Sequence, residues 1–384
     1  MGKEEERKSN KAIRYRLYPD AKQREMFART FGCCRKVWNL MLSDKKASYD
    51  KTGSFGSQTP AMYKKEYPYL KEVDSLALAN VQLNLQQAMR NCFDKNRKNK
   101  NGFPQFKSAK RSRKAYTTNN QNGTVAISDK AIRLPKIGWV KAVIHRHPDD
   151  TWVLKSATIS QDSDGKYYAS VLFEYSVTVS ETAVSDNVIG LDYKSDGLYI
   201  DSNGHNCSMP HFYRDEAKRL ARAQRRLSRM KGSRKGEIKS RNYLKQLTKV
   251  NRIHKHISNQ RKDFLHKEST KIANSVDIVC VEDLNMKAMS NKGFGNGKAT
   301  LDNGYGLFLN MLEYKLADRG KRLVTVDKWF ASSQICSCCG AVHPEMKNLS
   351  ARTMICGCGA VLNRDYNAAI NIKKEGLRLL ETVA

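Results

Sequence analysis

The first hundred residues carry apolar side chains at the 3.6-residue spacing of amphipathic helices. This spacing runs through AKQREMFARTFGCCRKVWNLMLSDKKASYD and again through residues 75–98. Before them, AIRYRLY at residues 12–18 alternates like a short strand, and Pro19 with Asp20 then supplies a turn and a helix start. The pattern predicts one strand followed by a mostly helical block, which ends in the basic and polar stretch KNKNGFPQFKSAKRSRKAYTTNN.

From about residue 123 the hydrophobic pattern changes to the two-residue period of strands. The predicted strands are TVAIS, AIRLP, WVKAVIH, WVLKSATIS and YYASVLFEY, with turns at HPDD and DSDG. They predict a small antiparallel barrel or sandwich, which the strand at 12–18 could join. The polar linker SVTVSETAVSDN ends this region.

The rest of the chain predicts an α/β core. VIGLDY and LYIDSNG form a predicted β-hairpin that turns at KSDG. A helical stretch over residues 214–271 then contains 20 Lys and Arg against five Asp and Glu, which predicts a basic pair of helices beside a polyanion. A solvent-facing helical hairpin is the alternative. VDIVCVEDL, YGLFLNMLEYKLADRG and RLVTVD follow as strand, helix and strand, as in α/β folds.

The charge of the chain points to a polyanionic partner. Its 384 residues contain 69 Lys and Arg against 38 Asp and Glu, a formal net charge of +31. Nucleic acid is the first candidate partner for so basic a protein. The N-terminus lacks the apolar core of a signal peptide and no run of about 18 apolar residues occurs, so we expect a soluble intracellular protein. A Walker-type phosphate loop is also missing from the sequence, so ATP use is not indicated.

Three carboxylates stand out by their positions. Asp192 lies within an apolar strand, Glu282 ends another, and Asp365 precedes an Asn-Ala-Ala helix start. Acids near strand ends of an α/β sheet can converge outside the carboxyl ends of the strands, and such oxygen ligands suit Mg²⁺ or Mn²⁺. Two ions about 3.5–4 Å apart would activate a water and stabilise the leaving oxygen of a phosphodiester. Each acid alone is typical of a turn or cap, but the trio in so basic a chain favours a nuclease.

Five of the ten cysteines crowd into 23 residues, which indicates a metal site in a reducing compartment. Two pairs, one CxxC and one CxC, offer the four thiolates of a closed tetrahedral Zn²⁺ site with a structural role. The simplest ligand set is Cys336, Cys339, Cys356 and Cys358. Because CxC is shorter than usual, Cys338 or His343 could be a ligand instead. Six residues separate Cys358 from Asp365, so we expect metal binding to help position that acid.

Several motifs in combination resemble a known family. YRLYPDAKQREMFARTFGCCRKVWN, GLDYKSDG, VCVEDLNM, SSQICSCCG and CGCGAVLNRDYNAAINI resemble those of TnpB, the RNA-guided nucleases encoded by bacterial insertion sequences. The resemblance covers essentially the whole chain. It implies an α+β multidomain protein with a wedge-type β-barrel, a helical recognition insertion, and a RuvC nuclease domain of RNase H-like α/β fold that a zinc-binding module interrupts. The implied domains are a first wedge strand (1–18), the helical recognition domain (19–120), the wedge β-barrel (121–185), the RuvC domain (186–335), the zinc-binding target-nucleic-acid-binding module (336–358) and the C-terminal part of RuvC (359–384).

The resemblance also implies roles for the acids. Asp192, Glu282 and Asp365 match the catalytic RuvC acids in the family's order Asp, Glu, Asp, whereas a DDE transposase has Asp, Asp, Glu. They would bind two Mg²⁺ ions, or Mn²⁺, and DNA cleavage would leave a 5′-phosphate. Family members usually read DRD before the Asn-Ala-Ala motif, and this chain has Asn363-Arg364-Asp365. Since only the second acid of that motif is catalytic in the family, the departure does not put activity in doubt.

The partners implied by the resemblance are a guide RNA and double-stranded DNA. An RNA transcribed from the transposon end would pair with one DNA strand, while the protein reads a short adjacent motif. By loose alignment a helix and a loop would face that motif; a merely exposed polar helix and loop is the alternative. Their residues are Asn80, Asn84, Tyr116, Thr117, Thr118 and Asn119. The protein would act in the bacterial cytoplasm at the nucleoid. Rival interpretations are a compact type V CRISPR effector and a non-cleaving RNA-guided DNA-binding repressor.

Overall fold

The computed structural model describes residues 4–94, 102–180, 186–234, 236–291, 297–348 and 350–383. It contains two compact units, one of Lys8–Ser176 and one of Val177–Ala384 together with Met1–Arg7. Of the helices in the described ranges, none combines the length and the apolar composition that crossing a lipid bilayer requires.

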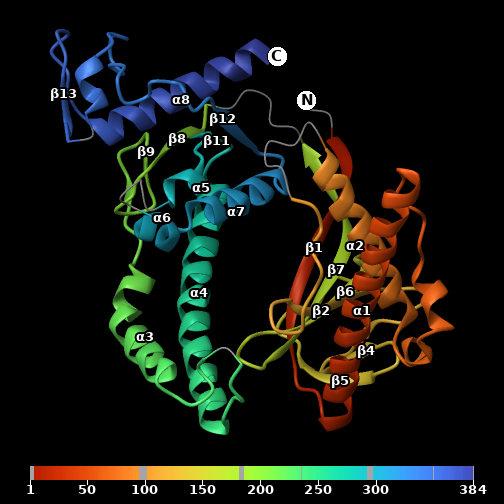
Figure 1. Ribbon diagram of the computed structural model, residues 1–384. Coiled ribbons are helices and arrows are strands. Elements are labelled where there is room, and N and C mark those ends of the chain that lie inside the picture. The colour runs from red at the N-terminus through yellow and green to blue at the C-terminus, as the bar shows by residue number, and fades with distance from the viewer. Residues whose placement is uncertain are drawn as a thin grey trace. The chain divides into compact units, whose positions relative to one another are not determined.

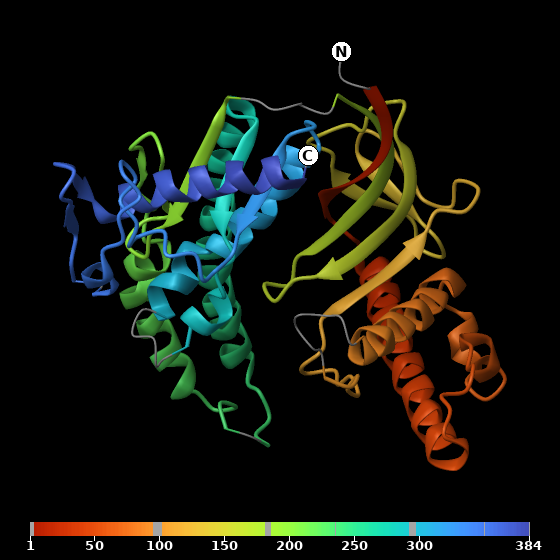
Figure 2. The same cartoon turned by 90° about the horizontal axis from the view of Figure 1, so that it is seen from above.

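The first unit is built on one seven-stranded sheet of order β2-β6-β7-β1-β5-β4-β3, which curves in Figure 2. Its strands are β1 (Glu4–Leu17), β2 (Lys114–Asn119), β3 (Ala126–Ile127), β4 (Ala131–Leu134), β5 (Gly138–Val143), β6 (Val153–Gln161) and β7 (Tyr167–Ser180). β1 pairs antiparallel with β5, and β6 pairs antiparallel with both β2 and β7. The predicted antiparallel region is therefore confirmed, and the strand predicted at 12–18 belongs to it.

In its described residues, the first unit also contains two α-helices and two short 3-10 helices. They are α1 (Ala21–Thr52), η1 (Pro60–Lys64), η2 (Pro68–Lys71) and α2 (Ser75–Phe93). The predicted start of α1 is confirmed, because the Asp20 carboxylate accepts from the Gln23 N–H while the Gln23 side chain accepts from the Asp20 N–H. The helix predicted over 75–98 ends at Phe93, and residues 95–98 lie outside the described ranges.

The prediction of a loop at residues 116–119 is wrong. These residues lie in strand β2, which pairs with β6 from Lys114↔Gln161 to Asn119↔Ser156. The alternation of the strand turns Tyr116 into the core, where its ring lies 5.9 Å from that of Phe31 on α1. The two-residue pattern of a strand is hard to recognise in KAYTTN, because its inward positions include one aromatic residue, Tyr116, and the polar Thr118.

The second unit contains a five-stranded mixed sheet of order β10-β9-β8-β11-β12 (Figure 1). Its strands are β8 (Val188–Tyr193), β9 (Tyr199–Asp201), β10 (Asn206–Cys207), β11 (Ile278–Glu282) and β12 (Arg322–Val326), and a separate hairpin is formed by β13 (Thr353–Ile355) and β14 (Val361–Asn363). β8 is antiparallel to β9 and parallel to β11, which is parallel to β12. The predicted hairpin and the predicted alternation of strand, helix and strand are both confirmed.

Helices cover both faces of this sheet. Within the described ranges, the helices of the second unit are α3 (Phe212–Ser228), α4 (Arg241–Ser275), α5 (Met286–Met289), α6 (Gly297–Asn303), α7 (Tyr305–Ala317), the 3-10 helix η4 (Pro344–Lys347) and α8 (Arg364–Val383). α4 and α7 bury Leu265, Ile272, Phe308 and Leu312 against one face. α8 covers the other face, where Ile372 packs with Val188 and Cys280. In Figure 1 the sheet accordingly lies between α8 and the pair α4 and α7.

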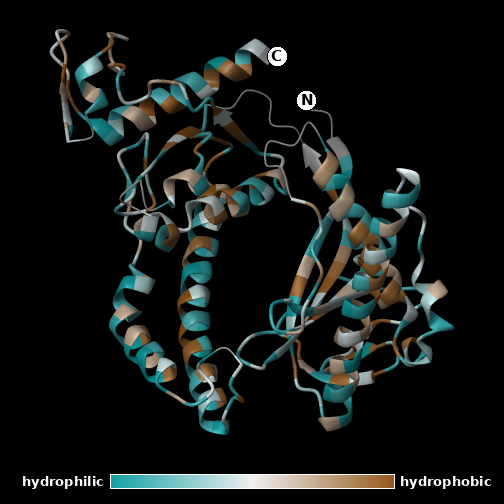
Figure 3. Ribbon diagram, in the orientation of Figure 1, coloured by the Kyte–Doolittle hydropathy of each residue, from teal (hydrophilic) through white to brown (hydrophobic). Residues whose placement is uncertain are grey.

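The basic stretch 214–271 forms the predicted pair of helices. α3 and α4 pack through a narrow apolar seam, and along both helices hydrophobic residues alternate with hydrophilic ones in Figure 3. The seam consists of Leu220, Ala223, Val250, Ile253 and Ile257. The arginines at the end of α3 are exposed instead. An open cleft of about 450 Å³ is lined by Arg222, Arg225, Arg226 and Arg229.

Two glycines let α8 lie directly on the sheet. A methyl group at Gly190 of β8 would run into the carbonyl oxygen of Ala369 and would lie 2.7 Å from the Lys373 nitrogen, both on α8. A methyl group at Gly376 of α8 would collide with Cys280 of β11. The start of α8, which carries Asp365, is thereby held close to the end of β8.

Gly190→Ala is expected to lower the free energy of unfolding by about 2–3 kcal/mol, because the added methyl group meets backbone that cannot rotate away. Chemical denaturation checks this. The control is Gly306→Ala in α7, whose methyl group would meet only the Met286 side chain at 3.8 Å and which should be neutral or stabilising by up to about 1 kcal/mol. Equal destabilisation by the two changes would contradict the close contact of α8 and β8.

Candidate active site and cysteine centre

The three acids singled out in the sequence lie at one edge of the five-stranded sheet. Leu191 pairs with Val281 in the parallel register of β8 and β11, so the next residues, Asp192 and Glu282, stand at the carboxyl ends of neighbouring strands. Asp365 lies in the first turn of α8, the helix that packs on β8. The fold therefore brings together acids that are up to 173 positions apart in the sequence (365 − 192).

The carboxyl groups at this edge interact electrostatically, as the pKa of Asp192 indicates. Burial, then the nearby charges of Glu282 and Asp365, raises the pKa of Asp192 well above its ordinary value, and Arg364 opposes this shift. Burial also raises the pKa of Glu282. Partly buried carboxylates that repel one another favour a bound cation.

The oxygen atoms of the three carboxyl groups lie farther apart than the ligands of a single ion would. Within the described ranges, the group of three or more His, Cys, Asp or Glu whose ligand atoms lie within 4.8 Å of one another is the set of four cysteines. A wider spacing suits a pair of ions about 3.5–4 Å apart better than a single ion. The donor set of hard carboxylate oxygens fits Mg²⁺ or Mn²⁺.

The Glu282 side chain is held by a residue that the sequence did not reveal. Ser332 is buried, and its hydroxyl donates to the Glu282 carboxylate, which opposes the rise in the pKa of that group. The Ser332 carbonyl in turn accepts from the Asn371 amide of α8 at 2.8 Å. The segment after β12 is thus fixed to one acid by its side chain and to α8 by its backbone.

The predicted four-cysteine set forms one cluster. All four sulfurs lie within 4.8 Å of one another, with Cys336 Sγ 3.8 Å from Cys358 Sγ and Cys339 Sγ 3.5 Å from Cys356 Sγ. A tetrahedral ion with ligand bonds of about 2.3 Å separates its sulfurs by about 3.8 Å, so the spacing fits Zn²⁺. The backbone N–H of Cys339 is the main cause that lowers the pKa of Cys336 to about 6, which favours the thiolate.

The shortened CxC pair makes the same kind of turn as the CxxC pair. The Cys336 N–H donates to the Ala341 carbonyl at 2.8 Å, and the Cys356 N–H donates to the Ala360 carbonyl at 2.9 Å, one residue sooner. Of the alternative ligands, Cys338 lies outside the cluster. His343 Nδ1 lies 2.9 Å from a Glu345 carboxylate oxygen instead. The simplest of the predicted ligand sets is therefore the one that the fold assembles.

Two asparagines join the cysteine cluster to α8. The Asn367 amide donates to the Ile335 carbonyl, and its oxygen accepts from the Ser337 N–H at 2.8 Å, on either side of Cys336. Asn371, one helical turn later, donates to the same Ile335 carbonyl at 2.6 Å. Both asparagines are buried. A cysteine turn and the helix that carries Asp365 are consequently fixed to each other.

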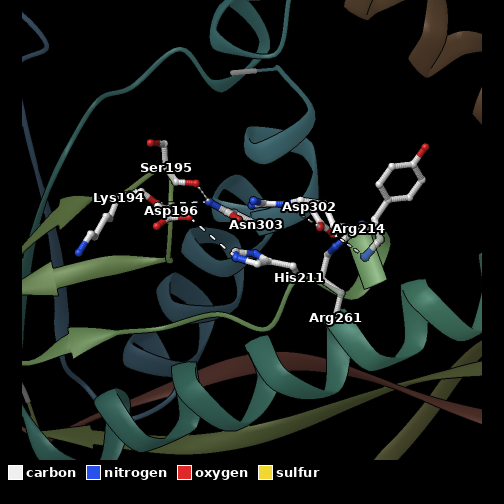
Figure 4. A network of polar contacts seen from close by, with 9 residues as sticks. Lys194, Ser195, Asp196, His211, Arg214, Arg261, Asp302 and Asn303 are labelled. Atoms are coloured by element: carbon white, nitrogen blue, oxygen red, sulfur yellow. Dashed lines mark hydrogen bonds and ion pairs between the residues drawn. The ribbon is translucent and has the colours of Figure 1, made fainter. Parts of the chain in front are cut away.

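A second polar network holds the turn that follows Asp192 (Figure 4). The Asn303 amide, at the end of α6, donates to the carbonyls of Lys194 and Ser195 at 3.3 and 2.9 Å. The neighbouring Asp302 is 2 % exposed and accepts from the Arg261 guanidinium at 2.9 Å and from the Tyr213 N–H at 3.1 Å. The end of α6 therefore ties the β8–β9 turn to the start of α3 and to the middle of α4.

Asp302→Ala is expected to destabilise the protein by about 3–5 kcal/mol, because it leaves Arg261 and the Tyr213 N–H inside the protein without their acceptor. Thermal unfolding at neutral pH measures the effect. Asp263→Ala serves as the control and should cost less than about 1 kcal/mol, because this exposed aspartate of α4 pairs at 2.7 Å with Lys267, which is also exposed. A small effect of Asp302→Ala would show that the buried ion pair does not hold these elements.

The residues expected at the DNA motif lie in the first unit and are only partly assembled. Asn80, Asn84, Tyr116 and Thr117 line one small cavity of about 150 Å³. Thr118 is fully buried, so it is not placed to contact a ligand, and Asn119 does not line the cavity. Four basic residues also line it: Arg35, Lys107, Arg113 and Lys114. The last three belong to the basic and polar stretch recognised in the sequence, but the cavity that they share with α1 and α2 was not predicted.

The chain matches three protein-family models. Residues 9–54 match a model described as "Helix-turn-helix domain", residues 170–293 match the IS605 OrfB model described as "Probable transposase", and residues 305–372 match "Cas12f1-like, TNB domain". The last match contains the whole cysteine cluster, and the second contains Asp192 and Glu282.

Similar proteins are found over the whole length. A protein of Streptomyces pristinaespiralis named "Putative RNA-guided DNA endonuclease" is 34% identical, over 96% of this chain and 89% of its own. Escherichia coli (strain K12) "Putative RNA-guided DNA endonuclease InsQ" is 29% identical over 96% and 93%. The mimivirus "TnpB-like protein L79" is 29% identical over 34% of this chain.

The fold is similar to that of a solved protein. A chain of "Cryo-EM structure of the Cas12f1-sgRNA-target DNA complex" matches with a TM-score of 0.58 over 95% of this chain and 99% of its own, at 14% identity. The protein thus has a mixed α+β multidomain fold of the Cas12f type. Taken together with the OrfB model and the full-length relative of Streptomyces, this means that the chain belongs to the TnpB family of IS605-type insertion sequences.

Proposed function

We propose that the protein is an RNA-guided, Mg²⁺-dependent endonuclease of double-stranded DNA. The observation that carries the proposal is the meeting of Asp192, Glu282 and Asp365 at the carboxyl edge of the five-stranded sheet, where their charges act on one another. The sheet order, with three antiparallel strands followed by two parallel ones, supports a RuvC domain of RNase H-like fold. The names of the two relatives from Streptomyces pristinaespiralis and Escherichia coli, which match 96% of this chain, agree with this activity.

The residues at this edge would divide the work. Asp192, Glu282 and Asp365 would hold two Mg²⁺ ions, or Mn²⁺, which when bound activate a water and stabilise the leaving oxygen of the phosphodiester, leaving a 5′-phosphate. Ser332 fixes the direction of one Glu282 oxygen by its hydrogen bond. Asn303 holds the turn after β8 and so limits the movement of Asp192. The side chains are thereby positioned before DNA arrives.

The cysteine cluster would bind a structural Zn²⁺ ion. All four thiolates point inward to one another, so no ligand position remains for a substrate. Through Asn367 and Asn371 the ion would stabilise the start of α8 and with it Asp365. We retain Cys336, Cys339, Cys356 and Cys358 as the ligands.

The nucleic-acid partners would be a guide RNA from the transposon end and a matching DNA duplex. The outward arginines of α3 offer charge to phosphates without reading sequence. The small cavity lined by Asn80, Asn84 and Thr117 would face the target-adjacent motif, because amide and hydroxyl groups can hydrogen-bond to base edges. Base pairing with the guide would then read the rest of the target.

The experiment uses the protein purified with its co-expressed RNA and a plasmid that carries a matching target beside randomised adjacent sequences. We expect linear plasmid in Mg²⁺ and intact plasmid in EDTA or with Asp192→Ala. Asp186→Ala is the matched control, since this exposed aspartate lies just before β8, and it should cut like the parent. If Asp192→Ala also cuts, the assignment of that acid is wrong.

The same preparation separates the alternatives. Target binding without any cut at saturating Mg²⁺ would identify a guided repressor. Sequencing of the co-purified RNA would show transposon-end RNA if the proposal is right, and CRISPR repeats if the protein is a compact type V effector.

A further inference from the structure

Trp329 lies almost wholly in solvent on a short loop after β12. Trp329 is 82 % exposed, whereas Trp139 is 49 % exposed. A tryptophan side chain buries a large apolar area when it can, so an exposed one on a rigid segment is a candidate contact for a partner.

The loop holds Trp329 in this exposed position. The Trp329 N–H donates to the Asp327 carboxylate at 2.8 Å, and the Phe330 N–H donates to the Asp327 carbonyl at 3.0 Å. The Phe330 side chain packs into the apolar cluster under α8, together with Val326 and Ile372. With its neighbours anchored in this way, the indole is held outward by the turn.

Both ends of this loop also contact Glu282. Val326, the last residue of β12, pairs with Glu282 in the parallel register, and its carbonyl accepts from the Asp283 N–H at 3.0 Å. Six residues after Val326, Ser332 donates to the Glu282 carboxylate. Trp329 is midway, three residues from each contact, so its Cα lies within about 10 Å of both. That is about the length of three stacked nucleotides at 3.4 Å each.

The charge beside the ring is positive. The Lys328 ammonium lies 5.0 Å from the centre of the Trp329 ring and is itself exposed. An exposed aromatic ring beside a lysine is the combination that binds single-stranded nucleic acid, because a base stacks on the ring while the cation pairs with the backbone phosphate. A protein partner would be served equally well by the ring, but the net charge of +31 favours a polyanion.

We propose that Trp329 stacks on an unpaired base of the DNA strand that reaches the acids and so acts as a positioning residue for cleavage. The inference rests on the proposed function, since it takes Glu282 as part of the site that cuts. Stacking on the exposed ring would fix one nucleotide within a few steps of the scissile phosphate. Lys328 would add a phosphate contact of little sequence preference.

The binding test uses the guide-RNA complex in an Asp192→Ala background, so that DNA stays intact. The adenine analogue 2-aminopurine, whose fluorescence falls on stacking, is placed in turn at each position around the cut site of the target. We expect quenching at one or two positions, lost with Trp329→Ala and retained with Trp329→Phe. Trp139→Ala, which removes an exposed tryptophan of the other unit, should leave the quenching unchanged.

The kinetic test measures single-turnover cleavage of saturating target. Trp329→Ala should slow cutting by about tenfold, within the roughly 5- to 150-fold that loss of one base stack produces, and Trp329→Phe by less than about threefold. The thermal unfolding midpoint should not move, because the side chain is exposed. Equal quenching and equal rates for parent and Trp329→Ala would overturn the inference, as would a defect seen only in cells, which points to a protein partner. If the parent itself fails to cut, the proposed function fails, and the quenching result still decides whether Trp329 stacks.

Discussion

Asp192→Asn is expected to abolish DNA cleavage and, in the absence of divalent ions, to make the protein more stable. The carboxyl group of Asp192 is partly buried beside Glu282 and Asp365, and the folded protein raises its pKa. Asparagine has nearly the same shape but no charge to bury. We expect the free energy of unfolding at pH 7 in EDTA to increase, since a folded-state pKa above the ordinary value means that the ionised Asp192 carboxylate destabilises the fold. Cleavage should fall by roughly a thousandfold or more.

The pH dependence gives this prediction its sharpest form. Because the folded-state pKa of Asp192 lies above the ordinary value of 3.8, the folded protein holds more protons than the unfolded chain between the two values. Stability of the metal-free protein should therefore decrease as pH rises from about 4 through the folded-state pKa, and level off above it. Asp192→Asn should remove this part of the slope, and Mg²⁺ should reduce it in the parent. Thermal unfolding between pH 4 and 8 measures both, and identical slopes in parent and variant would contradict the account.

Cys356→Ser is expected to release Zn²⁺ and to impair cleavage much more than guide-RNA binding. The four thiolates form one cluster, so loss of one opens the whole site. The cluster is tied to α8 through Asn367 and Asn371, and α8 carries Asp365. We expect cleavage to fall by about a hundredfold, in line with the loss on removing support around a metal site, while RNA affinity changes by less than about threefold.

Metal content, cleavage and RNA binding are measured on the same preparation. The matched control is Cys338→Ser, which replaces an exposed cysteine two residues from Cys336 and outside the cluster. It should retain both Zn²⁺ and activity. Equal loss of RNA binding and cleavage in Cys356→Ser would mean general unfolding, and loss of Zn²⁺ from Cys338→Ser would mean a different ligand set.

Periodicity and spacing predicted the features that depend on neighbours in the sequence. The strand at 12–18, the start of α1 and the CxxC with CxC cluster are all of this kind. Each has a local cause: alternation, a capping pair, or two short turns that each present two sulfurs. The acids were recognised as a trio in a very basic chain, since each of them alone is typical of a turn or a cap.

The supporting residues could not be predicted, because their partners are distant in the sequence. Ser332 binds an acid 50 positions away, and Asn303 binds a turn more than 100 positions away. Asn367 and Asn371 lie four residues apart, so the sequence places them on one face of α8, but it does not show that the Ile335 carbonyl lies opposite that face. The strand at β2 was missed because its outward side chains are as polar as those of a loop.

The narrow seam between α3 and α4 has a consequence for the lifetime of the protein. Five small and medium apolar side chains hold together two helices whose outer faces repel each other. Anions that neutralise these faces should stabilise the pair, so we expect the bare protein to open there more readily and to expose arginines and lysines to proteases. Copies without RNA would be degraded first, so the amount of nuclease in a cell would follow the supply of its guide.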